Sequence, residues 1–502
     1  MSGPLLLAID QGTSSTKALL VDARGEVVGR AQAPVSLAAP QPGWVQQDGE
    51  EIWSSVRRAA SQALDGDAAK RVVSVGLSTQ RESCVIWDRR TGEALTPVLS
   101  WQDQRTEGVC AALRAAGHAA TVRRRSGLPL DPMFSAAKAR WLLDQLPQGQ
   151  GRAKAGDICI GTIDAFLLSR FGGEVVIEAG NASRTQLFDV VGAKWDEELL
   201  AIFDVPLAAL PRVVASTGPF PKVRGLAPLA DGMPVGAVLA DSHSALFAHG
   251  AFAPGPVKAT QGTGSSIMGL VDRSAAPDGN AGAPGVCLTL AWQLDAPMLA
   301  YEGNIRSAGS TLIWAAELLG VSTEELAALA ASAPDSRGVY LVPAFGGLGA
   351  PWWDANASAT ATGFSFGATR APFARAALDS IAHQIADVVD ALRASGAPVE
   401  RLLVDGGPTR NDQLMQFEAD MVGLQVERTK VAELSAMGVA HLAGVSAGLF
   451  TLESLAKLDR GAERFAPHMD GAVRAHERRQ WAQAVARARL LPVPQETRSA
   501  PQ

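Results

Sequence analysis

Cysteine is scarce in this chain of 502 residues. The sequence holds only four: Cys84, Cys110, Cys159 and Cys287. None of them forms a Cys-x-x-Cys pair or a Cys/His cluster with metal-ligand spacing. A disulfide framework and a cysteine-based zinc site are therefore excluded, and we interpret the four side chains as isolated thiols in a reducing compartment.

An excess of positive charge is also missing. The 45 Lys and Arg are outnumbered by 51 Asp and Glu, which gives a net charge of −6. Nucleic-acid binding needs a basic surface that neutralises phosphates, so we expect no nucleic-acid partner. The apolar run of residues 5–9 ends at Asp10 and is too short to cross a bilayer, and no signal-peptide pattern surrounds it. We therefore expect a cytoplasmic protein without a membrane partner.

Two common nucleotide-binding fingerprints are absent as well. The sequence has no Gly-x-x-x-x-Gly-Lys-Ser/Thr loop, and no Gly-x-Gly-x-x-Gly follows a strand. A Walker-type kinase is excluded, and a dehydrogenase becomes a distant alternative. What remains is a long globular chain with 47% hydrophobic and 19% charged residues, whose length favours two large domains.

A strand–turn–strand pattern occurs twice. Residues 5–9 and 18–22 are apolar runs on either side of a polar turn, and residues 257–260 and 267–271 repeat this plan. Both turns contain Gln-Gly-Thr followed by Ser-Ser, with one extra Gly in the second. Chance similarity of two short turns is the alternative, but the repeat favours an α/β protein with two related halves.

A Gly-, Pro- and Ala-rich segment at residues 247–256 separates the two halves. We therefore expect one domain at residues 1–248, a second at 249–490, and a disordered polar tail at 491–502. Apolar periodicity predicts helices near residues 50–64, 111–120, 374–392 and 413–421.

The first turn has the residues of a phosphate site. Gly12 lets the backbone approach a phosphate closely, and the next three residues add hydroxyl and amide donors. Asp10 could hold Mg²⁺, which proteins bind through one or two carboxylates plus phosphate oxygens. An ordinary polar hairpin turn is the alternative. The candidate phosphate-binding residues are Thr13, Ser14, Ser15 and Lys17.

Two further turns extend this pattern. Gly262, Thr263 and Gly264 repeat the phosphate turn in the second half. An apolar strand at residues 402–404 then leads to a Gly-Gly turn, where Gly407 admits a flat ligand such as adenine and Asn411 can hydrogen-bond its edge. Each turn alone has a plain structural interpretation, but three nucleotide-type turns in this order favour ATP.

Asp241 is the candidate catalytic base. It ends an apolar strand just before the domain boundary, where a carboxylate could accept the proton of a hydroxyl during phosphoryl transfer. His243 is the rival base. Arg81, Glu82 and Trp101 suit a polyol or sugar, because charged groups pair with hydroxyls and an aromatic face covers C–H groups. A surface ion pair and a core tryptophan are the alternative.

These motifs, in this order, resemble the FGGY carbohydrate kinases, and glycerol kinases most of all. Further stretches carry the resemblance: residues 126–132, 161–164, 181–185, 343–354 and 404–407. The resemblance implies an α/β fold with two actin-like, ribonuclease H-like domains of the actin–hexokinase superfamily around a central cleft. It also implies Mg²⁺ near Asp10, Asp241 as base, a glycerol-type site at Arg81, Glu82 and Trp101, and Gly309 as a further nucleotide contact. A homodimer is the assembly we favour.

Two acceptor-side positions depart from the glycerol kinase pattern, as does Ile313 on the nucleotide side, where glycerol kinases carry a glutamine. After the Leu-Pro-Leu-Asp-Pro of residues 128–132, glycerol kinases carry a tyrosine that binds glycerol, whereas this chain has Met133. The residue after the base is usually glutamine and here is Ser242. We therefore predict an ATP-dependent kinase for a small polyol or sugar with an altered acceptor pocket. The alternatives are an authentic glycerol kinase and a non-catalytic, ATP-dependent actin-like switch.

Overall fold

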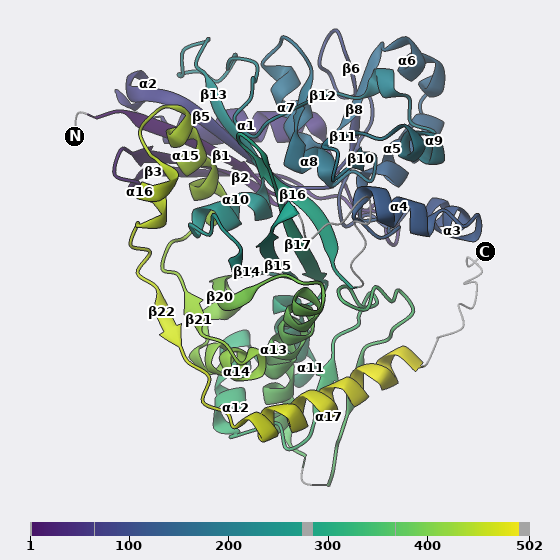
Figure 1. Ribbon diagram of the computed structural model, residues 1–502, viewed down its shortest axis with the longest axis vertical. Coiled ribbons are helices and arrows are strands. Elements are labelled where there is room, and N and C mark those ends of the chain that lie inside the picture. Colours follow the sequence, from purple (N-terminus) through teal and green to yellow (C-terminus); the bar gives the residue numbers. More distant parts are fainter. Residues whose placement is uncertain (1–2, 65, 274–284, 367, 491–502) are drawn as a thin grey trace.

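The computed structural model describes residues 3–64, 66–273, 285–366 and 368–490. Its two main sheets belong to two lobes, one above the other in Figure 1. The tail at residues 491–502, expected to be disordered, lies outside the described residues.

The first sheet has the strand order β13-β5-β1-β2-β3. Strands β1 and β2 form an antiparallel hairpin, β3 pairs antiparallel with β2, and β5 and β13 add in parallel beside β1. All five residues of the apolar run in β1 are buried, as a strand covered on both faces requires. The strands are β1 Leu5–Gln11, β2 Ser15–Asp22, β3 Val27–Pro34, β5 Val72–Thr79 and β13 Val235–Ala240.

The second sheet has the order β16-β17-β15-β14-β20-β21-β22. Its hairpin of β14 and β15 takes β17 antiparallel on one side, and β20 followed by β21 in parallel on the other. This reproduces the arrangement around β1 and β2, so the repeat expected from the two turns is present in the fold. The strands are β14 Gly255–Gln261, β15 Ser265–Val271, β16 Cys287–Gln293, β17 Pro297–Ile305, β20 Val399–Gly406, β21 Val426–Arg428 and β22 Glu463–Phe465.

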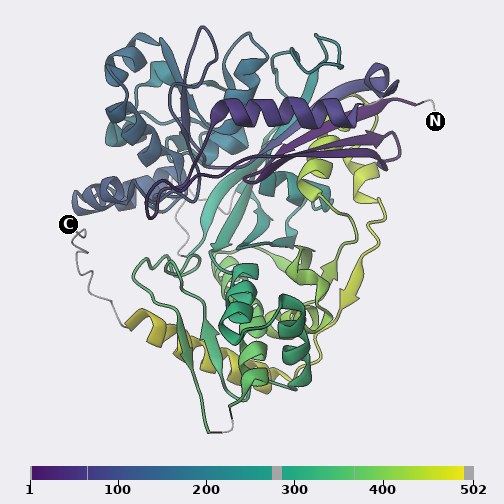
Figure 2. The same cartoon turned by 180° about the vertical axis from the view of Figure 1, so that it is seen from behind.

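Helices cover both sheets. In Figure 2, α1 crosses the face of the first sheet that lies toward the viewer. The Asp48 side chain caps α1 by accepting hydrogen bonds from the Glu50 and Glu51 amides, and the apolar side of the helix is buried. The helices are α1 Gly49–Ala63, α2 Ala68–Arg71, α3 Glu107–Ala115, α4 Ala119–Ser126, α5 Ser135–Gln145, α6 Gly149–Ala155, α7 Ile163–Arg170, α8 Ala179–Ser183, α9 Glu197–Phe203, α10 Asp241–Ala248, α11 Gly309–Leu319, α12 Thr323–Ser332, α13 Arg370–Ala394, α14 Asp412–Val422, α15 Leu434–Ser446, α16 Leu452–Ala456 and α17 Gly471–Leu490.

Five two-stranded sheets complete the described fold. They pair β4 Gln46–Gln47 with β7 Val98–Leu99, β6 Val85–Asp88 with β8 Ile158–Gly161, β9 Val176–Glu178 with β12 Arg212–Val214, β10 Phe188–Asp189 with β11 Lys194–Trp195, and β18 Tyr340–Val342 with β19 Thr360–Thr362.

One expected helix is wrong. Residues 111–120 do not form one helix but the end of α3, a turn, and the start of α4. Gly117 in this turn has φ +85°, and its amide donates to the Arg114 carbonyl at 3.0 Å. Because this left-handed conformation favours glycine, Gly117 ends the first helix where apolar periodicity alone would continue it.

Helices α10 and α15 pack against each other and against the first sheet, although α15 comes after most of the second sheet in sequence. Gly438 of α15 lies so close to α10 that a Cβ atom there would be 1.8 Å from the Ser244 carbonyl oxygen. This crossing connects the C-terminal part of the chain to the strand ends of the first sheet.

Candidate active site

The carboxyl ends of three parallel strands meet at one edge of the first sheet. Asp10 near the end of β1 pairs in register with Ser78 of β5, and Ala240 at the end of β13 pairs with Thr79. Asp241 and the loop containing Arg81 and Glu82 follow directly from these strands. The topology therefore gathers residues that are far apart in sequence at the strand ends, where open α/β sheets bind ligands.

Asp10 is a carboxylate held partly away from water. The Ser78 hydroxyl donates to Asp10 Oδ1 at 2.9 Å, and Lys17 lies opposite in the β1–β2 hairpin. Burial raises the pKa of Asp10 to about 6; the Ser78 hydrogen bond and Lys17 oppose this, and the charges of Asp241 and Glu433 add to it. A cation beside Asp10 would stabilise its ionised form.

The first turn closes between Gly12 and Ser15, with the Gly12 amide donating to the Ser15 carbonyl at 3.0 Å. The indole Nε1 of Trp101 donates to the Thr13 hydroxyl at 3.0 Å, which ties the acceptor-side tryptophan to the phosphate turn. Ser14 is exposed, and the Ser15 hydroxyl accepts from Gln32 at 2.9 Å. The predicted phosphate and acceptor residues are thus neighbours.

Asp241 is the first residue of α10, and 35% of its side chain is exposed. Arg81 Nε lies 3.2 Å from Asp241 Oδ1. Burial raises the pKa of Asp241, while Arg81 opposes the shift. The rival base, His243, is fully buried, and burial lowers its pKa well below the usual range. A neutral imidazole closed off from solvent is poorly placed to meet an incoming hydroxyl, so the geometry favours Asp241.

Met133 lies in an apolar wall. It packs against the cluster of Leu128, Phe134 and Cys287, and its own carbonyl accepts from the buried Lys138 ammonium at 2.6 Å. The Met133 amide donates to Asp131 at 2.9 Å, which fixes the loop. Ser242 is half-buried beside Asp241. Of the two residues that depart from the glycerol kinase pattern, Met133 therefore lies in apolar surroundings and Ser242 lies beside Asp241.

The nucleotide-side residues come together in the second half. The amide of Gly309, which begins α11, donates to the Gly262 carbonyl at 2.9 Å, and the amides of Ala308 and Ser310 donate to the Thr263 carbonyl. A Cβ atom on Gly309 would lie 3.4 Å from Pro408, directly after Gly407. The second phosphate turn and the Gly-Gly turn thus form one surface.

Asn411 has a structural contact that the sequence analysis missed. Its side-chain oxygen accepts from the Leu414 amide at 2.9 Å and caps α14. Its side-chain amide nitrogen, or the second lone pair of the oxygen, could then meet the edge of an adenine ring. Gly407 has φ −59°, and a Cβ atom there would meet nothing within 4 Å, so the space beside it is open.

Two buried charges were also missed. Both Glu302 of β17 and Lys258 of β14 are fully buried. Glu302 pairs with Arg81, and the Lys258 ammonium contacts the Ser266 hydroxyl. Each is the one charged residue of its strand, which is the signal in the sequence that could have identified it. Arg184 lies in one of the resemblance motifs but had no assigned role, and it is fully buried beside Glu82.

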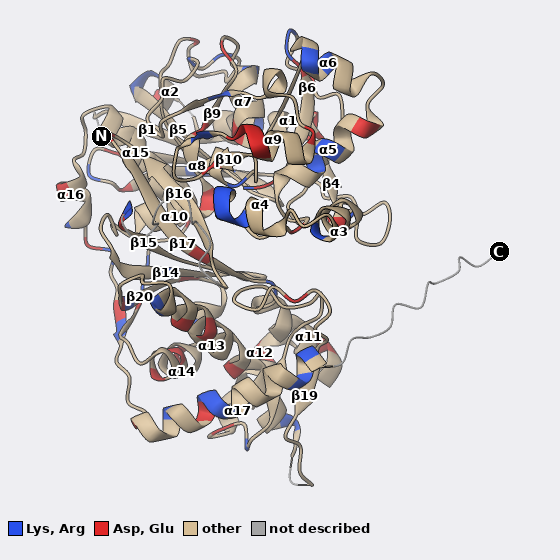
Figure 3. Ribbon diagram, turned by 45° about the vertical axis from the view of Figure 1, so that its right-hand side comes forward, with Lys and Arg blue, Asp and Glu red and all other residues tan. Residues whose placement is uncertain are grey.

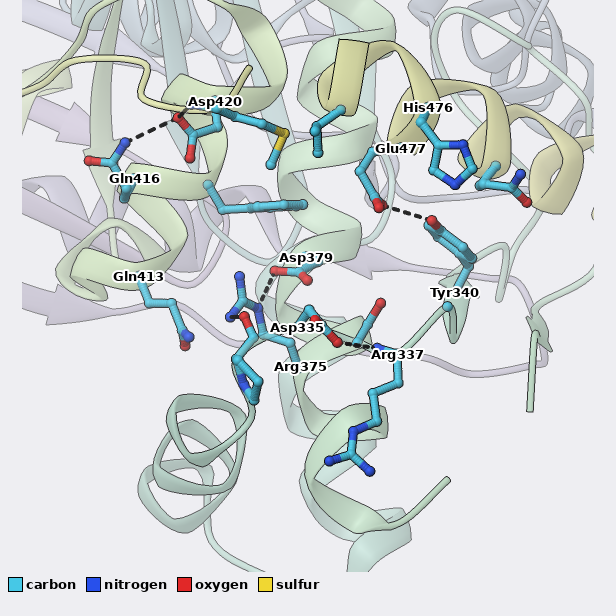
Figure 4. Close-up of a pocket in the computed structure, with 17 residues that line it drawn as sticks. Asp335, Arg337, Tyr340, Arg375, Asp379, Gln413, Gln416, Asp420, His476 and Glu477 are labelled. Atoms are coloured by element: carbon cyan, nitrogen blue, oxygen red, sulfur yellow. Dashed lines mark hydrogen bonds and ion pairs between the residues drawn. The ribbon is translucent and has the colours of Figure 1, made fainter. Parts of the chain in front are cut away.

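A second hollow lies elsewhere in the molecule. It has a volume of about 900 Å³ and lies between α13, α14 and α17, where Figure 4 shows Arg375 beside Asp379 and Tyr340 beside Glu477. None of the predicted site residues lines it. Acidic and basic residues are interspersed over both lobes in Figure 3. No helix within the described ranges is long and apolar enough to cross a membrane.

Comparison with known proteins gives full-length matches. The N-terminal domain model of the FGGY family of carbohydrate kinases matches residues 5–248, and its C-terminal domain model matches residues 257–447. A glycerol kinase of Aromatoleum aromaticum is 44% identical, covering 96% of this chain and 98% of that protein. An apulose kinase of Pectobacterium atrosepticum is 42% identical, covering 98% of this chain and 100% of that protein.

Among solved structures, glycerol kinase of Plasmodium falciparum with ADP superposes with a TM-score of 0.89 at 28% identity. The match covers 98% of this chain and 99% of that one. The α/β fold with two actin-like domains, expected from the sequence, is thereby confirmed.

Proposed function

Because this chain belongs to the FGGY family of carbohydrate kinases, and so phosphorylates a hydroxyl of a small sugar or polyol with ATP, we propose that its acceptor is a larger polyol or a ketose rather than glycerol. Met133 is the observation that carries this proposal. It replaces the tyrosine expected in glycerol kinases with a side chain that packs on Leu128, Phe134 and Cys287. The wall then offers no hydroxyl to glycerol, and Ser242 leaves more room beside the base than glutamine would.

Overall identity does not separate the acceptors. The two relatives, at 44% and 42% identity, are named glycerol kinase and apulose kinase, so the same scaffold supports both names. Authentic glycerol phosphorylation is the second candidate function, favoured by the first of these relatives. The residues of the acceptor site must therefore distinguish the two candidate functions. A site that loses the group that bound a ligand hydroxyl no longer discriminates in favour of that ligand.

We assign the roles within the cleft as follows. Residues 1–248 hold the acceptor on Arg81, Glu82 and Trp101 and supply the base. Residues 249–490 hold most of the nucleotide. The nucleotide contacts are Thr13, Ser14, Ser15, Lys17, Gly262, Thr263, Gly264, Gly309, Gly407 and Asn411. The homodimer remains a prediction.

Mg²⁺ fits the residues around Asp10. The pKa of Asp10 is raised, and the charge of Asp241 lies nearby. A bound cation would offset both effects, because a positive charge stabilises the ionised form of a carboxylate. No group of three or more His, Cys, Asp or Glu in the described part of the chain could form a protein-only cage. This suits a metal that takes one or two carboxylates and completes its shell with phosphate oxygens and water. When bound, Mg²⁺ would neutralise charge on the phosphates.

Asp241 acts on the acceptor hydroxyl. The acceptor oxygen forms a bond to the γ-phosphorus as the bond from that phosphorus to the bridging oxygen breaks, and ADP leaves. The hydroxyl proton passes to Asp241, which Arg81 holds at 3.2 Å. Trp101 covers the acceptor while its indole nitrogen stays fixed on Thr13. Most of the catalysis then comes from position and charge.

An acceptor panel tests the proposal. We expect coupled ADP detection to give a kcat/KM for erythritol, xylitol, ribulose or apulose at least about tenfold above that for glycerol. The substitution Met133→Tyr should raise the kcat/KM for glycerol and leave the KM for ATP unchanged. Efficient glycerol turnover with the larger acceptors idle would overturn the acceptor assignment and establish the second candidate.

A further inference from the structure

A network of six charged side chains lies beneath the acceptor site. Three are acids and three are bases, so the network is balanced in charge. Arg81, Glu82, Arg184 and Asp241 come from the first half of the chain, and Lys258 and Glu302 come from the second sheet. Asp241 alone is substantially exposed, since the other five side chains are 8% exposed or less.

Glu302 is the centre of this network. Its Oε1 lies 2.7 Å from Arg81 Nη1, and its Oε2 lies 2.8 Å from Arg184 Nη1. The Ser266 hydroxyl donates to Oε1 at 2.9 Å, and the buried Lys258 ammonium lies 3.4 Å from that hydroxyl. Burial alone would raise the pKa of Glu302, but Arg184 and Arg81 hold it well below its usual range. The carboxylate therefore stays ionised.

Each arginine that Glu302 holds also contacts an acceptor-side carboxylate. Arg81 reaches Asp241 through Nε at 3.2 Å, and Arg184 reaches Glu82 through Nε at 2.8 Å. A guanidinium group is a rigid planar fork, so fixing one edge fixes the direction of the other. The orientation of both carboxylates is thus set from the second sheet.

The complete burial of a charged side chain such as Glu302 requires an explanation. Buried ion pairs contribute little net stability because the desolvation cost offsets the attraction, whereas removing one partner is costly. Glu302 of the second sheet pairs with two arginines of the first half, and each of these arginines also contacts a carboxylate of the proposed acceptor side. Orientation of the site explains this arrangement better than stability does.

We propose that Glu302 is a positioning residue for phosphoryl transfer. From the second sheet it orients Arg81 and Arg184, and through them Asp241 and Glu82, so that the acceptor site is complete only where the second sheet meets the first. This inference rests on the acceptor and base roles proposed above for Arg81, Glu82 and Asp241.

The test is the substitution Glu302→Gln, measured with the best acceptor of the panel. Misplacing a catalytic group by a small distance costs about a hundredfold in rate. We expect kcat to fall by about that factor and the acceptor KM to rise about tenfold, while the KM for ATP stays within about twofold. Glu302→Asp keeps the charge but shortens the side chain, and it should restore less than a tenth of the activity.

A matched control is Asp379→Asn. Asp379 is buried and paired with Arg375 at 2.7 Å (Figure 4), in the hollow between α13, α14 and α17 that none of the predicted site residues lines. Both Asn and Gln variants remove a buried carboxylate from an arginine, and only Glu302→Gln should change the kinetic constants for the acceptor. Equal kinetics in the two variants at equal melting temperatures would overturn the positioning role.

Two further variants keep the outcome decisive. If Glu302→Gln does not fold, Ser266→Ala takes its place, because it removes one hydrogen bond to Glu302 without changing charge or fold. Wild-type acceptor kinetics in the Ser266→Ala variant would overturn the proposal. Asp241→Asn should abolish turnover while ATP-analogue binding persists. Near-normal turnover in Asp241→Asn would refute the proposed base itself, whereas loss there together with a fully active Glu302→Gln would refute the positioning role alone.

Discussion

Asp10, the proposed metal-binding carboxylate, illustrates how a buried acid affects stability. Its native pKa is raised to about 6, mainly by burial, so at neutral pH the folded state carries a charge that the unfolded chain holds more easily. Folded Asp10 binds its proton more tightly than unfolded Asp10 does. The resulting penalty is fully present above pH 6 and disappears as the pH falls through 6 toward 3.8, the usual pKa of an aspartic acid side chain.

We therefore expect Asp10→Asn to be more stable than the wild type and inactive. Its free energy of unfolding at pH 7 should be higher by about 1–3 kcal/mol, because the neutral amide still accepts from Ser78 without a buried charge. Denaturant melts at pH 7 and pH 4 measure this gain, which should shrink at the lower pH. As a control, Asp67→Asn changes an acid that is 82% exposed and should shift stability by less than about 0.5 kcal/mol. A less stable Asp10→Asn would contradict the burial argument.

At this scale the sequence predicted the residues that stand at turns and strand ends. Asp10 and Asp241 follow apolar runs directly, and the Arg81–Glu82 pair comes shortly after the strand that ends at Thr79, so their positions in the sequence indicate the edge they share. Glu302 and Lys258 lie inside strands, where local pattern cannot show that a charge in a core has partners from another sheet. The cap formed by Asn411 was missed because its partner, Leu414, lies in the helix that follows.

The glycines of the nucleotide turns differ in what surrounds them. Gly309 begins α11 against the Gly262 carbonyl, and a Cβ atom there would come within 2.6 Å of that oxygen. Gly407 faces open space and has ordinary helical torsions. The structure therefore separates a glycine that the fold needs from one that only a ligand would need.

We expect Gly407→Ala to leave the melting temperature unchanged and to weaken ATP binding about tenfold, since its methyl group would occupy the space proposed for adenine. Gly309→Ala should instead lower stability by about 1–3 kcal/mol through overpacking, and weaken ATP binding as well. Calorimetric titration with an ATP analogue and thermal melts measure both effects. Unchanged ATP affinity in Gly407→Ala would place the adenine elsewhere.

Elements were predicted where one local signal dominated. The strands of both hairpins, α1 and α13 follow apolar runs or long periodic stretches, and the structure has them within a few residues. Strands β10 and β11 pair locally, but the pairs β4 with β7, β6 with β8 and β9 with β12 join short strands of two to four residues that lie far apart along the chain. Pairing of this kind depends on tertiary contacts, which a local pattern does not contain.

Across the molecule, the repeat of two hairpins gives each of the two main sheets one of the turns predicted to bind phosphate. These predicted phosphate turns lie at residues 11–15 and 261–266, and the matching strand orders place them equivalently. The sequence predicted this repeat from the two strand–turn–strand patterns and their similar turns. The packing of α15 on the first sheet could not be predicted, because no local sequence pattern near residue 438 indicates a contact with α10.

Helices α10 and α15 are in close contact. Gly438 lies against the Ser244 carbonyl, where a Cβ atom would be 1.8 Å away, so the helices must move apart to admit any side chain. Asp241 begins α10 three residues before Ser244. A change that only enlarges the crossing should therefore also displace the proposed base.

We expect Gly438→Ala to lower the free energy of unfolding by about 1–3 kcal/mol, and to reduce kcat about tenfold or more with little effect on the KM for ATP. Differential scanning calorimetry and steady-state kinetics on the same preparation measure the two effects. Gly471→Ala is the control, because a Cβ atom at this start of α17 would meet nothing within 4 Å. A Gly438→Ala variant that melts lower but keeps full kcat would show that the crossing supports the fold without positioning Asp241, and the catalytic edge of the first sheet would then be independent of the C-terminal helices.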